Sequence, residues 1–226
     1  MSQPPRVVDF LFDYISSNAY LAWVKLLRME ADLGFTTRPV PVLFAGLLEA
    51  HGQLGPAEVR PKAIWMAANN LRKAALLGVP LHPPPFHPFN PLLALRVSGL
   101  PMAEEQRRAL VGALLDAVWA RQLHVMDPAV VARVASEQGL DGEKLVAQAG
   151  EPEAKARLRT ETDAAIARGV FGVPTMLVDD QLFWGFDDLP YLEMLLAGED
   201  PLARSDLAHW SRAPRPAAVR RRFRED

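Results

Sequence analysis

The amino-acid sequence predicts an α/β protein with one mixed β-sheet that is interrupted by a block of helices. Three observations support this fold class: two short apolar runs flank a helical pattern near the N-terminus, several helical patterns fill the middle, and two further short apolar runs precede the last helix. Two C-terminal strands without partners would be only marginally stable, which disfavours the alternative of two independent domains. We therefore expect the late strands to complete the sheet that the early strands begin.

The N-terminal part is expected to form a strand, a helix and a second strand. Residues 7–12 are apolar and rich in β-branched and aromatic side chains, which is typical of a buried strand. Each of the three polar residues at 16–18 can cap the helix that follows, and Gly34 ends this helix. Residues 36–43 resemble a second strand, but two prolines place it at a sheet edge or give it an irregular end.

The middle of the chain is predicted to be helical. Residues 83–91 are rich in proline and form a loop, in which Asn90 is suited to cap the next segment, and Gly169 ends the helical block. Apolar side chains recur with a helical period in five segments, at residues 56–77, 102–123, 128–138, 141–148 and 151–168.

A hairpin is expected after residue 169, followed by a last helix at 189–196. Pro174 precedes a short apolar strand, the acidic pair at 179–180 suits a two-residue turn, and a second strand surrounds Phe183. Proline cannot donate a hydrogen bond to a sheet, so it is confined to strand starts, edges or bulges. The step from Val173 to Pro174 is thus either an ordinary hairpin turn or a backbone that pairs with an extended peptide ligand.

Composition narrows the class of function. The chain has 226 residues, half of them hydrophobic, which fits one large domain or a domain with an insert. A net charge of −2 and a pI near 6.2 do not point to nucleic acid or an anionic membrane as partner. There is no cysteine, which excludes disulfides and thiol redox chemistry by the protein itself and agrees with a cytoplasmic location. We expect no signal peptide, no membrane-spanning helix and no metal site, and we interpret His82 and His87 as loop residues.

Two segments together resemble one family. The first is VDFLFDYISSNAYLAW at residues 8–23, and the second joins FGVPT at 171–175 to FWGFDDL at 183–189. Both are similar to the DsbA-like glutathione enzymes, above all the 2-hydroxychromene-2-carboxylate isomerases and next the kappa-class glutathione transferases. Between them, PAEVRPK at 56–62 and PFNPLLALR at 88–96 also resemble this family. The resemblance covers residues 6–198 in the same order, which makes it far more specific than a single motif.

The resemblance implies a thioredoxin-like mixed sheet of the DsbA and kappa type, with an inserted all-helical subdomain. Residues 6–80 and 169–198 would form the discontinuous thioredoxin-like domain, and residues 81–168 the helical insert. The resemblance also implies a cis peptide bond before Pro174. Residues 199–226 lie outside it, and we expect an extended or disordered tail there.

The family's catalytic serine corresponds to Ser16, at the junction of the first strand and the first helix. Its hydroxyl would donate a hydrogen bond to a glutathione thiolate and lower the pKa of the thiol, aided by the positive end of the helix dipole. The backbone of Val173 would pair with the cysteinyl part of glutathione, and Pro174 would fix the turn. The alternative is that Ser16 merely caps the helix, and Ser17 is the rival if the alignment is shifted by one residue.

Further contacts to glutathione follow from the resemblance. Asp187 would accept from the γ-glutamyl amino group, with Asp188 as the neighbouring alternative and an N-cap of the last helix as the structural one. Lys62 would neutralise a carboxylate, unless it is an ordinary solvated lysine. Gln53, where related enzymes often have asparagine, would hydrogen-bond the same ligand or is simply a loop residue.

The substrate would bind beside the helical insert. Asn90 and Arg96 flank the junction between the proline-rich loop and the next helix, and Arg96 could hold a substrate carboxylate in a bidentate pair. An arginine on a helix surface is the structural alternative. Trp184 and Phe44 are candidates for aromatic walls of the pocket, although such side chains more often belong to a core.

The resemblance implies a glutathione-dependent cis–trans isomerase of 2-hydroxychromene-2-carboxylate-like intermediates in aromatic degradation. One alternative is a kappa-like glutathione transferase or peroxidase with the same thiolate. Another is a catalytically silent thioredoxin-like binding module, which is suggested by Ser17 and Asn18 where the family has proline after the serine. Glutathione is the expected cofactor, a small molecule the substrate and a homodimer the assembly.

Overall fold

The structure is a computed structural model that describes residues 6–202. Its four-stranded sheet has the order β2-β1-β3-β4, in which β1 and β2 are parallel and the other two pairings are antiparallel. The late hairpin therefore completes the sheet begun at the N-terminus, and the predicted mixed-sheet α/β class is confirmed. The strands are β1 Val7–Phe12, β2 Thr36–Pro41, β3 Thr175–Val178 and β4 Gln181–Trp184.

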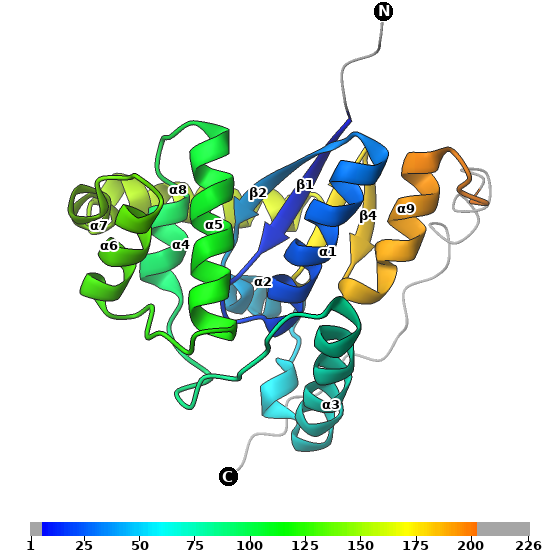
Figure 1. Ribbon diagram of the computed structural model, residues 1–226, viewed down its shortest axis with the longest axis horizontal. Helices are drawn as coiled ribbons and strands as arrows, with labels where there is room; N and C mark the ends of the chain where they lie inside the picture. Colours follow the sequence, from blue (N-terminus) through cyan, green and yellow to red (C-terminus); the bar gives the residue numbers. More distant parts are fainter. Residues whose placement is uncertain (1–5, 203–226) are drawn as a thin grey trace, which may run out of the picture.

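Helices cover both faces of this sheet (Figure 1). Because β1 is a central strand, its side chains are buried on both faces from Val8 onward. Phe10 and Phe12 pack into the larger core, while Leu11 packs on the opposite face with Leu177. Successive side chains of β1 point to opposite faces of the sheet, so this one strand contributes to both cores.

Most helices begin and end close to their predicted bounds. The helix α1 ends at Gly34, whose φ of +70° suits a residue without a side chain. The predicted helix over 56–77 is divided instead, because a regular helix cannot continue through Pro61 without losing a hydrogen bond. The helices are α1 Ser17–Leu33, α2 Phe44–His51, α3 Arg60–Leu77, α4 Leu92–Ser98, α5 Glu104–Trp119, α6 Pro128–Glu137, α7 Gly142–Ala149, α8 Pro152–Ala167 and α9 Leu189–Ala197, with 3-10 turns η1 Pro56–Glu58 and η2 Phe186–Asp188.

The elements between β2 and β3 divide into two groups in Figure 1. Helices α4 to α7 lie together on one side of β2, whereas α3 lies near the N-terminal end of α1. The division into residues 6–80 with 169–198 and an insert at 81–168 stays a prediction. The predicted tail at 199–226 lies outside the described residues from position 203 onward. Within the described part of the chain, every helix is too short or too polar to cross a membrane.

Candidate active site

Ser16 stands at the N-cap of α1. Its backbone is extended, and its Oγ accepts a hydrogen bond from the Ala19 N–H at 3.2 Å. A hydroxyl that accepts in this way still has its own proton to donate. The capping role and a role toward a bound anion are therefore compatible, and the N-terminus of α1 adds its positive partial charge.

The loop that leads from β1 to Ser16 is fixed from several sides. The Ser16 N–H donates to Asp13 O at 3.1 Å, and Trp119 Nε1 donates to Tyr14 O at 2.9 Å. His87 Nε2 lies 3.1 Å from Ile15 O, so the proline-rich loop reaches this site as well. These hydrogen bonds restrict the loop, so the Ser16 hydroxyl is positioned before a ligand binds and little conformational entropy is lost on binding.

Asp13 is the buried anchor beneath this loop. One carboxylate oxygen accepts from the Ile15 N–H at 3.0 Å and the other from the Phe44 N–H at 2.9 Å. Burial raises the pKa of this carboxyl to about 7, against the lowering effect of the two N–H donors. Asp13 thus ties the Ser16 loop to the start of α2. Asp13 is a site residue that the sequence alone does not single out, although an acidic residue directly after a buried strand is the available signal.

The hairpin segment lies at the same edge of the sheet as Ser16. Leu11 pairs with Thr175 in the antiparallel ladder, so the start of β3 adjoins the end of β1. The bond between Val173 and Pro174 is cis, as expected. Within residues 6–202, neither the N–H nor the C=O of Val173 has a hydrogen-bond partner, whereas Pro174 O accepts from the Gly185 N–H at 2.8 Å. The half-buried Val173 peptide therefore presents a donor and an acceptor to a ligand.

Asp187 reaches the first turn of α1 through Lys73, a residue that the sequence analysis did not consider. Lys73 Nζ donates to Asp187 Oδ2 at 2.9 Å and to Asn18 Oδ1 at 3.2 Å, and it lies 4.9 Å from the centre of the Phe186 ring. The Lys73 side chain is 8 % exposed, but that of Asp187 is 70 % exposed. Asp187 consequently has carboxylate surface left for a second cation.

Asp188 has a different environment from its neighbour. It occupies the N-cap position of α9, but its side chain makes no capping hydrogen bond there. One of its carboxylate oxygens accepts instead from the Trp184 N–H at 2.8 Å. Of the two adjacent carboxylates, Asp187 is the one connected to the first turn of α1.

Lys62 and Gln53 are exposed. Lys62 lies in the first turn of α3, and Gln53 follows α2, where its backbone N–H donates to Leu48 O at 2.9 Å. Neither side chain has a hydrogen bond or an ion pair within the described residues, and nothing in the structure links them directly to Ser16. They are accessible to a ligand.

Asn90 lies just before α4, whereas Arg96 lies in the last turn of this short helix rather than at its start. Asn90 Oδ1 accepts from the Leu92 N–H at 3.0 Å, so Asn90 orders the first turn of that helix. Arg96 is half-buried, and its Nε is buried without a hydrogen-bond partner in the described part of the chain. An unsatisfied guanidinium N–H is costly, which makes Arg96 a candidate for an acidic ligand group.

Of the two aromatic candidates, Trp184 is the more exposed. It is 47 % exposed, and its ring packs on Phe171 with 5.2 Å between ring centres. Phe44 is half-buried at the start of α2, next to the Asp13 carboxylate that its N–H contacts. Trp184 therefore lies beside the hairpin, and Phe44 beside the serine loop.

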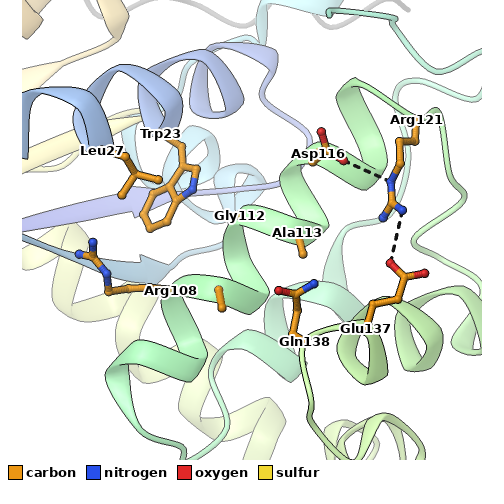
Figure 2. Close-up of a pocket in the computed structure, with 10 residues that line it drawn as sticks. Trp23, Leu27, Arg108, Gly112, Ala113, Asp116, Arg121, Glu137 and Gln138 are labelled. Carbon is orange, nitrogen blue, oxygen red and sulfur yellow. Dashed lines mark hydrogen bonds and ion pairs between the residues drawn. The ribbon is translucent and has the colours of Figure 1, made fainter. Parts of the chain in front are cut away.

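A shallow hollow of about 450 Å³ lies elsewhere, between α1, α5 and α6. Figure 2 shows Trp23 and Leu27 of α1 at one side and Arg121, paired with Asp116 and Glu137, at the other. None of the predicted site residues lines it. Because Arg121 is already paired with both acidic side chains, few charged groups of this hollow remain available to a ligand. We therefore place the candidate site at Ser16.

Comparison with known proteins gives the family of the chain. The model of the DSBA-like thioredoxin domain matches residues 7–197. A 2-hydroxychromene-2-carboxylate isomerase from Sphingobium xenophagum is 34 % identical over 195 residues, covering 84 % of this chain and 98 % of the relative. Human glutathione S-transferase kappa 1 is 25 % identical over 214 residues, 87 % of this chain and 93 % of the relative. A solved 2-hydroxychromene-2-carboxylate isomerase superposes with a TM-score of 0.79 at 29 % identity, covering 92 % of this chain and all of the other.

Proposed function

The chain belongs to the family of DsbA-like thioredoxin domains, and on this premise we propose that it is a glutathione-dependent isomerase of 2-hydroxychromene-2-carboxylate or a related enone acid. The observation that carries the proposal is the hydroxyl of Ser16 at the α1 N-terminus, which still has its proton to donate and lies at the sheet edge where the Val173 peptide is unpaired. The identity of about a third with isomerases along nearly their whole length supports the same activity.

The residues present fit glutathione as the cofactor. Val173 offers one N–H and one C=O for the cysteinyl backbone, in the manner of an added strand. Asp187 would accept from the γ-glutamyl ammonium with the part of its carboxylate that Lys73 leaves exposed. Lys62 and Gln53 are accessible for the remaining carboxylate and amide groups. When bound, glutathione supplies a thiolate that adds reversibly to a conjugated carbon and is returned unchanged.

The contribution of the protein to this chemistry is electrostatic and positional. Ser16 holds its hydroxyl proton toward the sulfur and stabilises negative charge there, together with the dipole of α1. The pKa of the thiol would fall for this reason, so that more of it is ionised near neutral pH. Serine cannot form a mixed disulfide, and the site is therefore suited to reversible addition rather than to redox exchange.

Substrate recognition would use α4 and the residue before it. Arg96 has a buried N–H without a partner, and a carboxylate is the group that best satisfies a guanidinium. Asn90 fixes the first turn of the same helix and is exposed beside the proline-rich loop. Trp184 and Phe44 would supply apolar surface for the aromatic ring of the substrate.

The proposal is tested by turnover of 2-hydroxychromene-2-carboxylate with and without reduced glutathione. We expect cis–trans isomerisation only when glutathione is present, with all glutathione recovered at the end. Isomerisation at the same rate without glutathione would contradict the proposal. Stoichiometric loss of glutathione with an electrophile would instead favour the second candidate, a transferase or peroxidase, which the kappa-class relatives support.

A third candidate is a binding module without catalytic activity. Its support is the pair Ser17 and Asn18, which departs from the family pattern directly after the proposed catalytic serine. Measured affinity for glutathione without turnover of either substrate class would favour this candidate over both enzymes.

We also propose that the protein acts as a cytoplasmic homodimer. The outer surface of α3 exposes Ile64 at 63 %, Trp65 at 60 % and Leu76 at 89 % of their areas. Burying such side chains between two copies would remove apolar surface from water. Light scattering should give twice the mass of the chain, and a monomer at high concentration would contradict the proposal.

A further inference from the structure

The start of α1 offers three consecutive side chains that can cap it. Ser16 is the N-cap, and Ser17 and Asn18 follow as the first two residues of the helix. Serine and asparagine readily hydrogen-bond nearby backbone groups, so Ser17 and Asn18 compete with Ser16 for the free N–H groups of the first turn. Which side chain caps the helix decides which hydroxyl faces the anion-binding end.

Two residues of α3 hold the side chains of both competitors. Asn70 Nδ2 donates to Ser17 Oγ at 2.8 Å, and Lys73 Nζ donates to Asn18 Oδ1 at 3.2 Å. Asn70 and Lys73 are three residues apart and therefore share one face of α3. They are 2 % and 6 % exposed, so this contact is part of the interior between α1 and α3.

The position of Ser17 makes such a contact useful. It is the first helical residue of α1, where a proline would fix φ and offers no hydroxyl to compete. Serine leaves φ unrestrained and brings a hydroxyl that can compete for the cap. The hydrogen bond from Asn70 occupies one acceptor site of Ser17 Oγ and holds the side chain toward α3.

Asn70 itself carries a further sign of a specific role. Its Oδ1 is buried and has no hydrogen-bond partner in residues 6–202. A buried amide that satisfies only one of its polar atoms costs stability compared with an apolar side chain of similar size. The bond to Ser17 is the contact that this amide does make.

We propose that Asn70 and Lys73 are positioning residues that leave Ser16 as the cap of α1 by engaging Ser17 and Asn18. The inference rests on the proposed function, because it matters for activity only if the Ser16 hydroxyl faces the glutathione sulfur. The inference adds to that function a role for α3, which would position the Ser16 hydroxyl without itself contributing a catalytic group.

The test is a rescue experiment in the full chain. Asn70→Leu keeps the buried volume but releases Ser17, so we expect kcat to fall about tenfold while the KM for glutathione changes little, because the Val173 and Asp187 contacts remain. Adding Ser17→Ala to Asn70→Leu removes the released hydroxyl and should restore kcat to within about twofold of wild type. A lost packing contact alone would not be rescued in this way.

The outcomes distinguish failure of the positioning role from failure of the proposed function. Full activity of Asn70→Leu, or a double variant that stays as slow as Asn70→Leu, would overturn the positioning role. If Asn70→Leu does not fold, Asn70→Ala with and without Ser17→Ala gives the same comparison. Wild type and Ser16→Ala are measured beside them: glutathione-independent turnover, or a fully active Ser16→Ala, would show that the proposed function has failed instead.

Discussion

Ser16→Ala removes one hydrogen bond that the structure shows and one that we propose, both made by the same oxygen atom. The Oγ accepts from the Ala19 N–H at 3.2 Å, which is long for such a bond, so we expect a loss of about 1 kcal/mol or less in the free energy of unfolding. The same hydroxyl would donate to a thiolate, and a hydrogen bond to a charged group contributes about 1.5–3 kcal/mol. The pKa of the bound thiol should therefore rise by about 1–2 units, and turnover should fall at least about tenfold.

Two assays separate these losses. Urea unfolding measures the capping term, and ultraviolet absorbance of the thiolate against pH measures the pKa of bound glutathione, together with turnover. Asp141→Ala is the matched control, because the Asp141 side chain caps α7 by accepting from the Lys144 N–H at 3.1 Å. The control should lose similar stability and keep full turnover. A Ser16→Ala protein that loses stability but keeps both turnover and thiol pKa would refute the catalytic role and leave a helix cap.

Three further predictions concern stability, pH and binding. A Cβ on Gly142 would lie 2.0 Å from Ala132 O, so Gly142→Ala should lower the unfolding free energy by about 3 kcal/mol in urea, and wild-type stability would contradict the close approach. Burial raises the pKa of Asp13 from 3.8 to about 7, so its contribution to stability is complete below about pH 4 and is lost as the pH rises through 7. Unfolding curves should show this decline in wild type but not in Asp13→Asn, and equal slopes would exclude it. Asp187→Asn should weaken glutathione binding about tenfold by calorimetry, and the effect should persist in the Lys73→Met background; unchanged affinity would remove Asp187 from the site.

Much of the fold was predictable because its signals are local. The strand at residues 7–12 and the end of α1 at Gly34 agree with the structure, since hydrophobic period and a C-terminal glycine are written in neighbouring residues. The helix α2 was not predicted. Asp13 accepts from the N–H of the helix's first residue, Phe44, and Thr162 accepts from the N–H of the preceding Leu43; these partners are 31 and 119 residues apart in the chain. The residues just before α2 include no side chain that caps it, so the local sequence gives no signal for its start.

The site residues also divide into those with a local sequence signal and those whose partners are distant in the chain. Ser16 and the Val173–Pro174 step could be found because each lies in a short motif at the end of an element. Asn70 and Lys73 could not, because their partners Ser17 and Asp187 are 53 and 114 residues distant in the chain. A polar residue on a helical face predicts only solvent exposure until the packing of α1 on α3 is known.

The proposed function requires that the glutathione sulfur lies between a hydroxyl at the start of α1 and the peptide before Pro174. A crystal structure with reduced glutathione measures this directly. We expect the sulfur within hydrogen-bond distance of Ser16 Oγ and the cysteinyl backbone paired with Val173. A sulfur bound to Ser17 instead, or glutathione seated in another part of the molecule, would contradict it.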